Sequence, residues 1–138
     1  MAIDLTISTA QGRVPVTVLH LHGDLDASNY EELITEARAA YDGGARDLLL
    51  DLSDVRYVSS SGLVALQSIA ALLRGDRVAD TSEGWGALHA VDRDREVGLQ
   101  QHFKLLKPQP RVQKVLTTVG FERFLQAFDD FDAAVASF

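Results

Sequence analysis

Three consecutive serines, Ser59, Ser60 and Ser61, are the side chains of this sequence best placed to do chemistry. With Gly62 they lie between an apolar stretch at residues 48–52 and a run whose apolar residues recur at helical spacing. This order predicts a strand, a turn and a helix. Serine hydroxyls at a helix start cap the free N–H groups, and the same groups favour an anionic substituent such as phosphate. The serine turn, residues 59–62, is therefore predicted to cap a helix and to be able to carry phosphate.

A serine at a strand–turn–helix junction could also be the nucleophile of a hydrolase, as in the G-x-S-x-G elbow. Ser60 and Gly62 match the end of that motif, but Val58 stands at its first glycine. A base is also required, and neither His89 in an irregular stretch nor His102 at a strand start has an acid before it in the expected framework. Serine hydrolase is therefore the third and weakest hypothesis, and no residue is assigned as catalytic.

Two histidines and two aspartates precede the first predicted helix. His20 and His22 share one face of a predicted strand, a spacing that could begin a metal site. No third ligand joins them, so they are interpreted as strand-face residues and no metal is predicted. Asp24 and Asp26 could be mistaken for an acid/base pair, but they precede a helix, where carboxylates cap the free N–H groups and favour the helix dipole. Because no Gly-rich phosphate loop is present either, no cofactor is predicted.

Composition limits the class of protein. A chain of 138 residues fits one domain, and the absence of cysteine excludes disulfides and thiolate sites. The net charge of −7 and the lack of a Lys/Arg cluster argue against direct binding to nucleic acid. There is no leader-like start and no apolar run of roughly 20 residues, the length of a membrane helix. We therefore expect a cytoplasmic protein without membrane insertion.

The elements that must position the serine turn begin with a β-hairpin. Apolar residues alternate with polar ones in residues 3–7 and again in residues 14–18, with a break at residues 10–13. Ser28 and Glu31 have the spacing of a capping box, which predicts that a helix starts there.

This helix is predicted to run to about Tyr41 and to end with a left-handed exit at the glycine pair 43–44. Further strands are predicted at residues 47–52, 102–106 and 124–128, and further helices at residues 61–73, from Pro110 to Gly120, and after a cap at Asp129 or Asp130. Strands separated by helices favour parallel pairing. The predicted fold is an α/β domain with a mixed, mostly parallel sheet, opened by the hairpin and packed against about four helices.

An irregular stretch at about residues 75–101 interrupts this pattern. It is rich in charge and glycine, and it is longer than most loops in compact domains. Trp85 is its one large apolar residue, either folded over an edge of the core or available to a partner. We predict a single domain, residues 1–138, with an insertion at about 75–101.

The sequence from residue 51 to 66 resembles the signature of the STAS domain family of anti-sigma-factor antagonists, approximately DLS-x-V-x-F-[MVI]-D-S-S-G-L-x-x-L. Every anchor matches except the acidic residue before the serine pair, which is Ser59 here. Residues 23–26 resemble the G-E-L-D loop of the family, and residues 107–121 resemble its later N-P-S-P-x-V…T-G-L segment. The resemblance covers nearly the whole chain.

The resemblance implies a regulatory binding module with no enzymatic activity. In the bacterial regulators of the family the first serine of the pair is phosphorylated by a serine kinase that is also the anti-sigma factor, and a phosphatase reverses the reaction. Ser60 is the corresponding residue here, ahead of Ser59 and Ser61. The implied partner-binding residues are Asp24, Asp26, Ser59, Ser60, Ser61, Gly62 and Leu63. The alternative is a STAS module that is not phosphorylated and serves as a scaffold or as a subunit of a transport or sensory complex.

Deletion of most of residues 76–98 is expected to leave the fold intact, because the predicted core pattern closes without them. The deleted chain should unfold in one cooperative transition in a denaturant titration followed by circular dichroism. A broad, non-cooperative transition would contradict the prediction.

Overall fold

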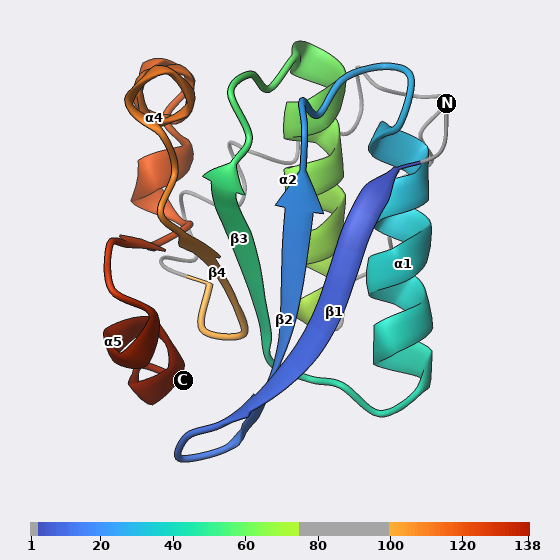
Figure 1. Ribbon diagram of the computed structural model, residues 1–138, viewed down its shortest axis with the longest axis vertical. Coiled ribbons are helices and arrows are strands. Elements are labelled where there is room, and N and C mark those ends of the chain that lie inside the picture. The colour runs from blue at the N-terminus through green and yellow to red at the C-terminus, as the bar shows by residue number, and fades with distance from the viewer. Residues whose placement is uncertain (1–2, 75–99) are drawn as a thin grey trace.

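A central sheet of five strands, in the order β1-β2-β3-β4-β5, organises the chain (Figure 1). The computed structural model describes residues 3–74 and 100–138, to which all structural statements below refer. The strands are β1 (Asp4–Gln11), β2 (Pro15–His22), β3 (Leu48–Asp54), β4 (Phe103–Leu106) and β5 (Ala127–Phe128). The helices are α1 (Tyr30–Asp42), α2 (Ser60–Leu73), α4 (Pro110–Thr118), the 3-10 turn η2 (Phe121–Arg123) and α5 (Phe131–Ala136).

The pairing of the strands confirms the predicted α/β fold with a mixed sheet. β1 and β2 form the antiparallel hairpin, and β2, β3, β4 and β5 are joined by parallel pairing. Of the insertion predicted at residues 75–101, residues 75–99 lie outside the described residues, and Trp85 is among them. No helix within the described ranges has both the length and the apolar character needed to cross a bilayer.

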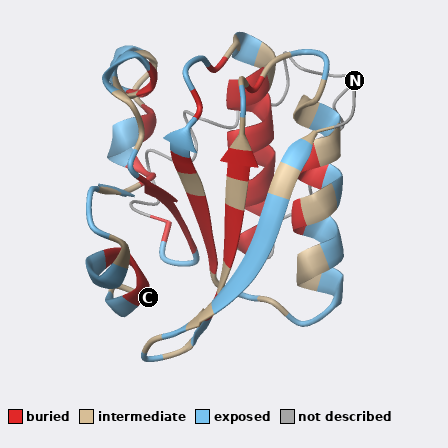
Figure 2. Ribbon diagram, in the orientation of Figure 1, coloured by how far each residue is buried: buried red, intermediate tan, exposed pale blue. Residues whose placement is uncertain are grey.

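The two faces of the sheet are covered unequally, because alternate residues of each strand point to opposite faces. On one face Leu19, Leu50 and Phe103 belong to the larger core, which also contains residues of α1, α2, α4 and η2. On the other face Val18 and Leu49 belong to a smaller cluster closed by α5. Figure 2 shows the contrast along the sheet: β2 and β3 are largely buried, whereas most of β1 is exposed.

The start of α1 differs from the predicted capping box. The residue before the helix is Asn29, and the amide and hydroxyl of Ser28 both donate to the Asp26 carboxylate. The capping-box prediction was wrong because Ser28 has a stronger partner close by. Its hydrogen bonds to the ionised Asp26 carboxylate are stronger than the bond that its hydroxyl would accept from a backbone N–H of the helix. At the other end Gly43 is still right-handed, and the predicted left-handed exit lies at Gly44, with φ of 112°.

The last strand is also shorter than the predicted residues 124–128. The backbone amides of Phe124 and Leu125 both donate to the Phe121 carbonyl, so these two buried residues belong to a tight turn after η2. Only Ala127 and Phe128 pair with β4. The final helix has one of the two predicted caps, since the Asp130 carboxylate accepts the Ala133 amide at 2.8 Å.

Lys104 of β4 is buried beneath the C-terminal helix, with only 2% of its surface exposed. Its Nζ donates to the carbonyl and hydroxyl oxygens of Ser137 at 2.8 and 3.0 Å. The same Nζ lies 4.7 Å from the ring centre of Phe138 and 5.8 Å from that of Phe128. Burial lowers the pKa of Lys104. The ammonium therefore ties α5 to the sheet at the cost of its own hydration.

Replacement of Lys104 by Met is expected to keep the free energy of unfolding within about 1 kcal/mol of wild type, because Met fills the same space without a charge to desolvate. Lys104→Ala should lose about 2–4 kcal/mol, since it leaves a cavity. The lowered pKa means that the unfolded chain binds more protons between the folded and the ordinary lysine pKa, so wild-type stability should rise with pH across that interval. Denaturant titrations should show this rise in wild type and a smaller one in Lys104→Met; equal slopes would contradict the account.

Candidate functional site

The neighbouring serines of the serine turn have different positions: one caps the helix and the next is exposed. Ser59 is the N-cap of α2, with extended backbone and an Oγ that accepts the Gly62 amide at 3.2 Å. Ser60 is the first residue of the helix and is exposed, while Ser61 is half-buried. Because Ser59 already caps the helix, the Ser60 hydroxyl is free to face solvent beside the positive end of the helix.

The loop at residues 23–26 lies directly against this turn. The Leu25 amide donates to the Tyr57 carbonyl at 3.0 Å, and the Ser59 amide donates to the Leu25 carbonyl at 2.9 Å. These bonds form an isolated parallel bridge between Leu25 and Val58. The structure thus brings together the two segments that the sequence placed in one site.

The two aspartates of this loop differ in what they bond. Asp26 accepts the Ser28 amide and hydroxyl, and these hydrogen bonds hold the pKa of Asp26 below its usual value. Asp24 is only partly exposed, and its buried Oδ1 has no hydrogen-bond partner among the described residues. Asn29 fixes both residues, donating to the Asp24 carbonyl and accepting the Asp26 amide. Asp26 therefore shapes the loop, whereas the buried Oδ1 of Asp24 bonds to none of the described residues.

Gly62 and Leu63, both predicted as partner-binding residues, are buried. A Cβ on Gly62 would lie 2.7 Å from Val58 Cγ1 and 2.9 Å from the Leu25 carbonyl oxygen. Only glycine allows the 23–26 loop to approach the helix this closely. These two residues position the exposed part of the site and present little surface of their own.

Tyr57 is an exposed residue that the sequence interpretation did not select. It precedes the serine turn, 45% of its surface is exposed, and its carbonyl holds the Leu25 amide. Val55 and Val58 on either side are buried. The sequence did contain a sign of this exposure. Val55 and Val58 already supply the contacts of this loop with the core, so Tyr57 is not needed as a third buried apolar residue.

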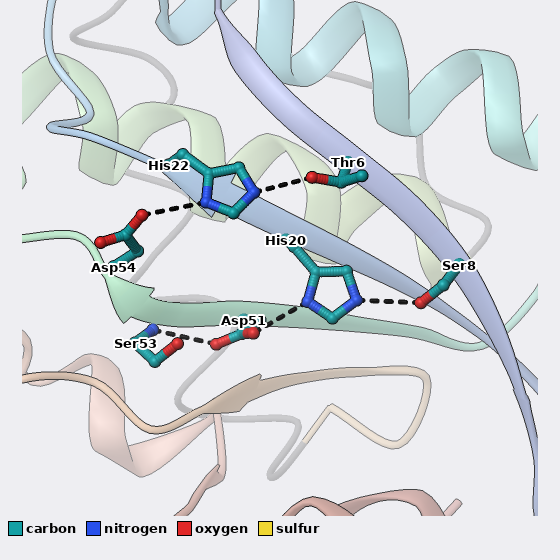
Figure 3. Close-up of polar contacts among 7 residues, drawn as sticks. All are labelled: Thr6, Ser8, His20, His22, Asp51, Ser53 and Asp54. Atoms are coloured by element: carbon teal, nitrogen blue, oxygen red, sulfur yellow. Dashed lines mark hydrogen bonds and ion pairs between the residues drawn. The ribbon is translucent and has the colours of Figure 1, made fainter.

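Two rows of polar side chains cross the open part of the sheet, each running from β1 through β2 to β3 (Figure 3). In one row Ser8 Oγ lies 2.9 Å from His20 Nε2, and His20 Nδ1 lies 2.9 Å from Asp51 Oδ2. In the other, Thr6 Oγ1 is 2.7 Å from His22 Nε2, and His22 Nδ1 is 3.0 Å from Asp54 Oδ2. We call these the polar rows. They confirm that both histidines are strand-face residues.

The carboxylate of Asp51 is the most constrained group of the polar rows. Burial opposes its ionisation, but the Ser53 amide, which donates to Oδ1 at 2.9 Å, and the His20 ring outweigh this and hold the pKa of Asp51 below its ordinary value. Asp51 and Ser53 are the first and third residues of the DLS segment. The motif therefore has a structural role, to join β3 to β2 through an ionised side chain.

Each polar row has the hydroxyl–imidazole–carboxylate order found in serine hydrolases, but the surroundings do not fit that chemistry. An oxyanion hole requires N–H donors that point at the oxygen of the bound substrate. The backbone N–H groups of a sheet lie near its plane, so those of the strands do not point at an oxygen bound above Ser8. His20 and His22 have side-chain exposures of 28% and 37% on an open surface. Within the described ranges, no group of three or more His, Cys, Asp or Glu could hold a metal ion. The polar rows are cross-strand ties.

Comparison with known proteins gives a family match and a curated relative of low identity that covers most of the chain. A family model described as "Mlab, STAS domain" matches residues 8–84. The protein BtrV of Bordetella bronchiseptica, named as an anti-sigma factor antagonist, is 27% identical over 118 residues, which are 86% of this chain and 82% of that protein.

Solved structures share the fold across nearly the full length of both chains. An anti-sigma factor antagonist from Mycobacterium paratuberculosis has a TM-score of 0.66 at 17% identity, covering 98% of this chain and 92% of that chain. SpoIIAA, an anti-sigma factor antagonist, has a TM-score of 0.53 at 19% identity in its unphosphorylated form, with coverage of 94% and 92%. Phosphorylated SpoIIAA from Bacillus has a TM-score of 0.52 at 18% identity, with coverage of 96% of each chain. The fold is therefore SpoIIAA-like.

Substitution of Asp51 by Asn is expected to cost about 1–3 kcal/mol of stability at neutral pH, because it removes the charge and one of the two oxygens of a part-buried carboxylate that bonds to an amide and an imidazole. Asp54→Asn is the matched control and should cost less than about 1 kcal/mol, since the Asp54 side chain is 69% exposed. The pKa of folded Asp51 is lowered, so its contribution is full above the ordinary aspartate pKa and is lost as pH falls through the folded value. Urea titrations at neutral and acidic pH should show the two variants converging in acid; equal losses at neutral pH would contradict this.

Proposed function

The chain belongs to the STAS domain family, and from this premise we propose that it is an anti-sigma-factor antagonist switched off by phosphorylation of Ser60. In the unmodified state it binds a kinase-type anti-sigma factor and so releases a sigma factor. We infer a cytoplasmic setting, where the kinase finds Mg-ATP, and we assign the chain no catalytic activity. The observation that carries the proposal is the exposed Ser60 hydroxyl beside a helix N-terminus that Ser59 already caps.

The proposed docking surface is built from the exposed groups around the serine turn. Tyr57 offers a large aromatic side chain, of the kind enriched among residues that dominate binding energy. Asp24 lies on the adjoining loop and is partly exposed, so its carboxylate adds negative charge to this surface, which suits a cationic group of the anti-sigma factor. Gly62 and Leu63 support this surface from beneath, and Asp26 holds its loop.

Phosphorylation would act on this surface through charge and size. The Ser60 oxygen attacks the γ-phosphorus of ATP, the bond from that phosphorus to the bridging oxygen breaks, ADP leaves, and the hydroxyl proton passes to a base of the kinase. The product carries roughly −1.5 to −2 charges beside an exposed tyrosine. The helix N-terminus accommodates the phosphate without unfolding, but a docked partner would have to desolvate it. Binding is therefore expected to weaken.

The names of relatives support the proposal. BtrV and the Mycobacterium paratuberculosis protein are both named as anti-sigma factor antagonists. SpoIIAA has been solved in unphosphorylated and phosphorylated forms, so a protein of this fold can carry phosphate and remain folded.

Incubation of the purified chain with the kinase encoded nearest to its gene and Mg-ATP is expected to place one phosphate on Ser60, as mapped by mass spectrometry. Ser60→Ala should abolish the modification, and Ser61→Ala should leave it unchanged. Ser60→Asp and Tyr57→Ala should each weaken binding to the anti-sigma factor at least tenfold, which is about 1.4 kcal/mol, in calorimetric titrations.

Two results would contradict the proposal in different ways. Phosphate on Ser59 or Ser61 instead of Ser60 would move the switch to another hydroxyl. Binding that is unchanged by phosphate and by Ser60→Asp would replace the switch with a fixed scaffold.

A further inference from the structure

Within residues 3–74 and 100–138, β1 is an edge strand that lacks the usual protection against pairing with another strand. Residues 5–10 contain no charge and no proline, and β1 pairs with β2 without a bulge. Natural edge strands usually carry Lys, Pro or a bulge to prevent such pairing. The four residues 6–9 are all exposed, and Ile7 is one of the two exposed large apolar residues among those described, at 49%. Figure 2 shows this exposed strand along the edge of the sheet.

The direction of the backbone groups of β1 follows from a hydrogen bond one strand away. The Thr17 amide donates to the Asp47 carbonyl at 2.9 Å, so the backbone groups of Thr17 point away from β1. Thr9 lies opposite Thr17 in the antiparallel register. Backbone groups in such a pair point away from each other, and the direction alternates along the strand. The N–H and C=O groups of Thr9, Ile7 and Leu5 therefore point to the free edge.

The free edge has limits on both sides. At its start the Ile3 amide donates to the Glu32 carboxylate of α1 at 2.8 Å, so that position is already occupied. At its end the strand enters the hairpin turn after Gln11. The outward-facing residues 5, 7 and 9 between these limits are symmetric about Ile7.

We propose that a second copy of this chain pairs with this edge, β1 against β1, antiparallel across a two-fold axis at Ile7. Leu5 then lies opposite Thr9 of the second copy, and Ile7 lies opposite its own counterpart. Each of these pairs exchanges both of its backbone hydrogen bonds. The exposed isoleucines meet on one face of the joined sheet. On the other face Thr6 lies opposite Ser8 of the second copy, while their hydroxyls keep their bonds to His22 and His20.

The same register explains why the occupant is a second copy of the chain. The free stretch is its own complement, because the outward residues match under the two-fold and no like charges lie opposite each other within residues 5–9. A pairing this short falls below the roughly 1,200–2,000 Å² of a standard interface, so the dimer is weak. Each chain also carries −7 charges, which oppose association until salt screens them.

Sedimentation velocity over a dilution series of the full chain tests the association. We expect a monomer at low concentration, a dimer at high concentration, and at least a threefold tighter association when salt is raised from about 0.05 to 0.5 M. Ile7→Lys should abolish the dimer by placing two ammonium groups at the axis, while Ile7→Thr retains the neutral edge and remains self-associating. A chain that stays monomeric at high concentration in both salts would overturn the proposal.

Single cysteines test the register, and the chain has none of its own. Ile7→Cys should form a disulfide-linked dimer under mild oxidation, because paired Cα atoms lie about 5.5 Å apart. Thr9→Cys is the matched control on the same strand: the two Thr9 positions are offset along the paired strands by more than the 7 Å that a disulfide can bridge. Cross-linking of Thr9→Cys as fast as Ile7→Cys would overturn the proposed two-fold.

The dimer does not depend on the proposed phosphorylation. Ser60→Ala is expected to leave both the sedimentation and the cross-linking unchanged, because Ser60 lies at the start of α2, which is not part of the strand edge. Circular dichroism of each variant checks that the monomer is folded. A loss of dimer in Ser60→Ala would overturn the assignment to β1.

Discussion

The backbone bridge at Leu25 is the interaction on which the candidate site depends. Leu25 is fully buried, its amide is held by the Tyr57 carbonyl, and its carbonyl is held by the Ser59 amide. The loop carrying Asp24 and the turn carrying Ser60 are thus parts of one hydrogen-bonded unit. That closeness leaves no room for a side chain at Gly62, since its Cβ would overlap Val58 and the Leu25 carbonyl. The glycine is therefore a packing requirement, and any partner meets a surface already fixed before it arrives.

The fold was predictable where local pattern and tertiary packing agree. The hairpin alternation, the apolar stretch before the serine turn and the helical spacing after it each indicated one element, and each is present. Errors arose where two groups compete for one partner. The pair Ser28 and Glu31 has the spacing of a capping box, but Asp26 takes both donors of Ser28. Likewise Phe124 and Leu125 are apolar enough for a strand, but the Phe121 carbonyl draws their amides into a turn. Spacing does not reveal which acceptor lies closest.

The closeness of the two segments of the candidate site was predictable, but the bonds that distinguish its residues were not. Residue types identified Asp24 and Asp26 as a pair, and only the structure separates the carboxylate that accepts both donors of Ser28 from the one whose buried Oδ1 bonds to no described residue. The polar rows could not be predicted from the sequence for a related reason. His20 and Asp51 lie 31 positions apart, and their contact exists because parallel pairing of β2 with β3 sets the register. Long-range pairing of this kind has no local signature.

The replacement of the family's acidic residue by Ser59 affects how a partner protein would detect a phosphate on Ser60. Aspartate and serine are similarly effective N-caps, and Ser59 does cap α2, so the helix start loses little by the change. What changes is the charge beside the proposed phosphoacceptor, Ser60. With an aspartate there, phosphorylation would add charge to a site already negative; with Ser59, it converts a locally neutral cap into one bearing roughly −1.5 to −2 charges. The phosphate would meet less repulsion from its own chain, and the contrast that a partner detects between the two states would come from Ser60 alone.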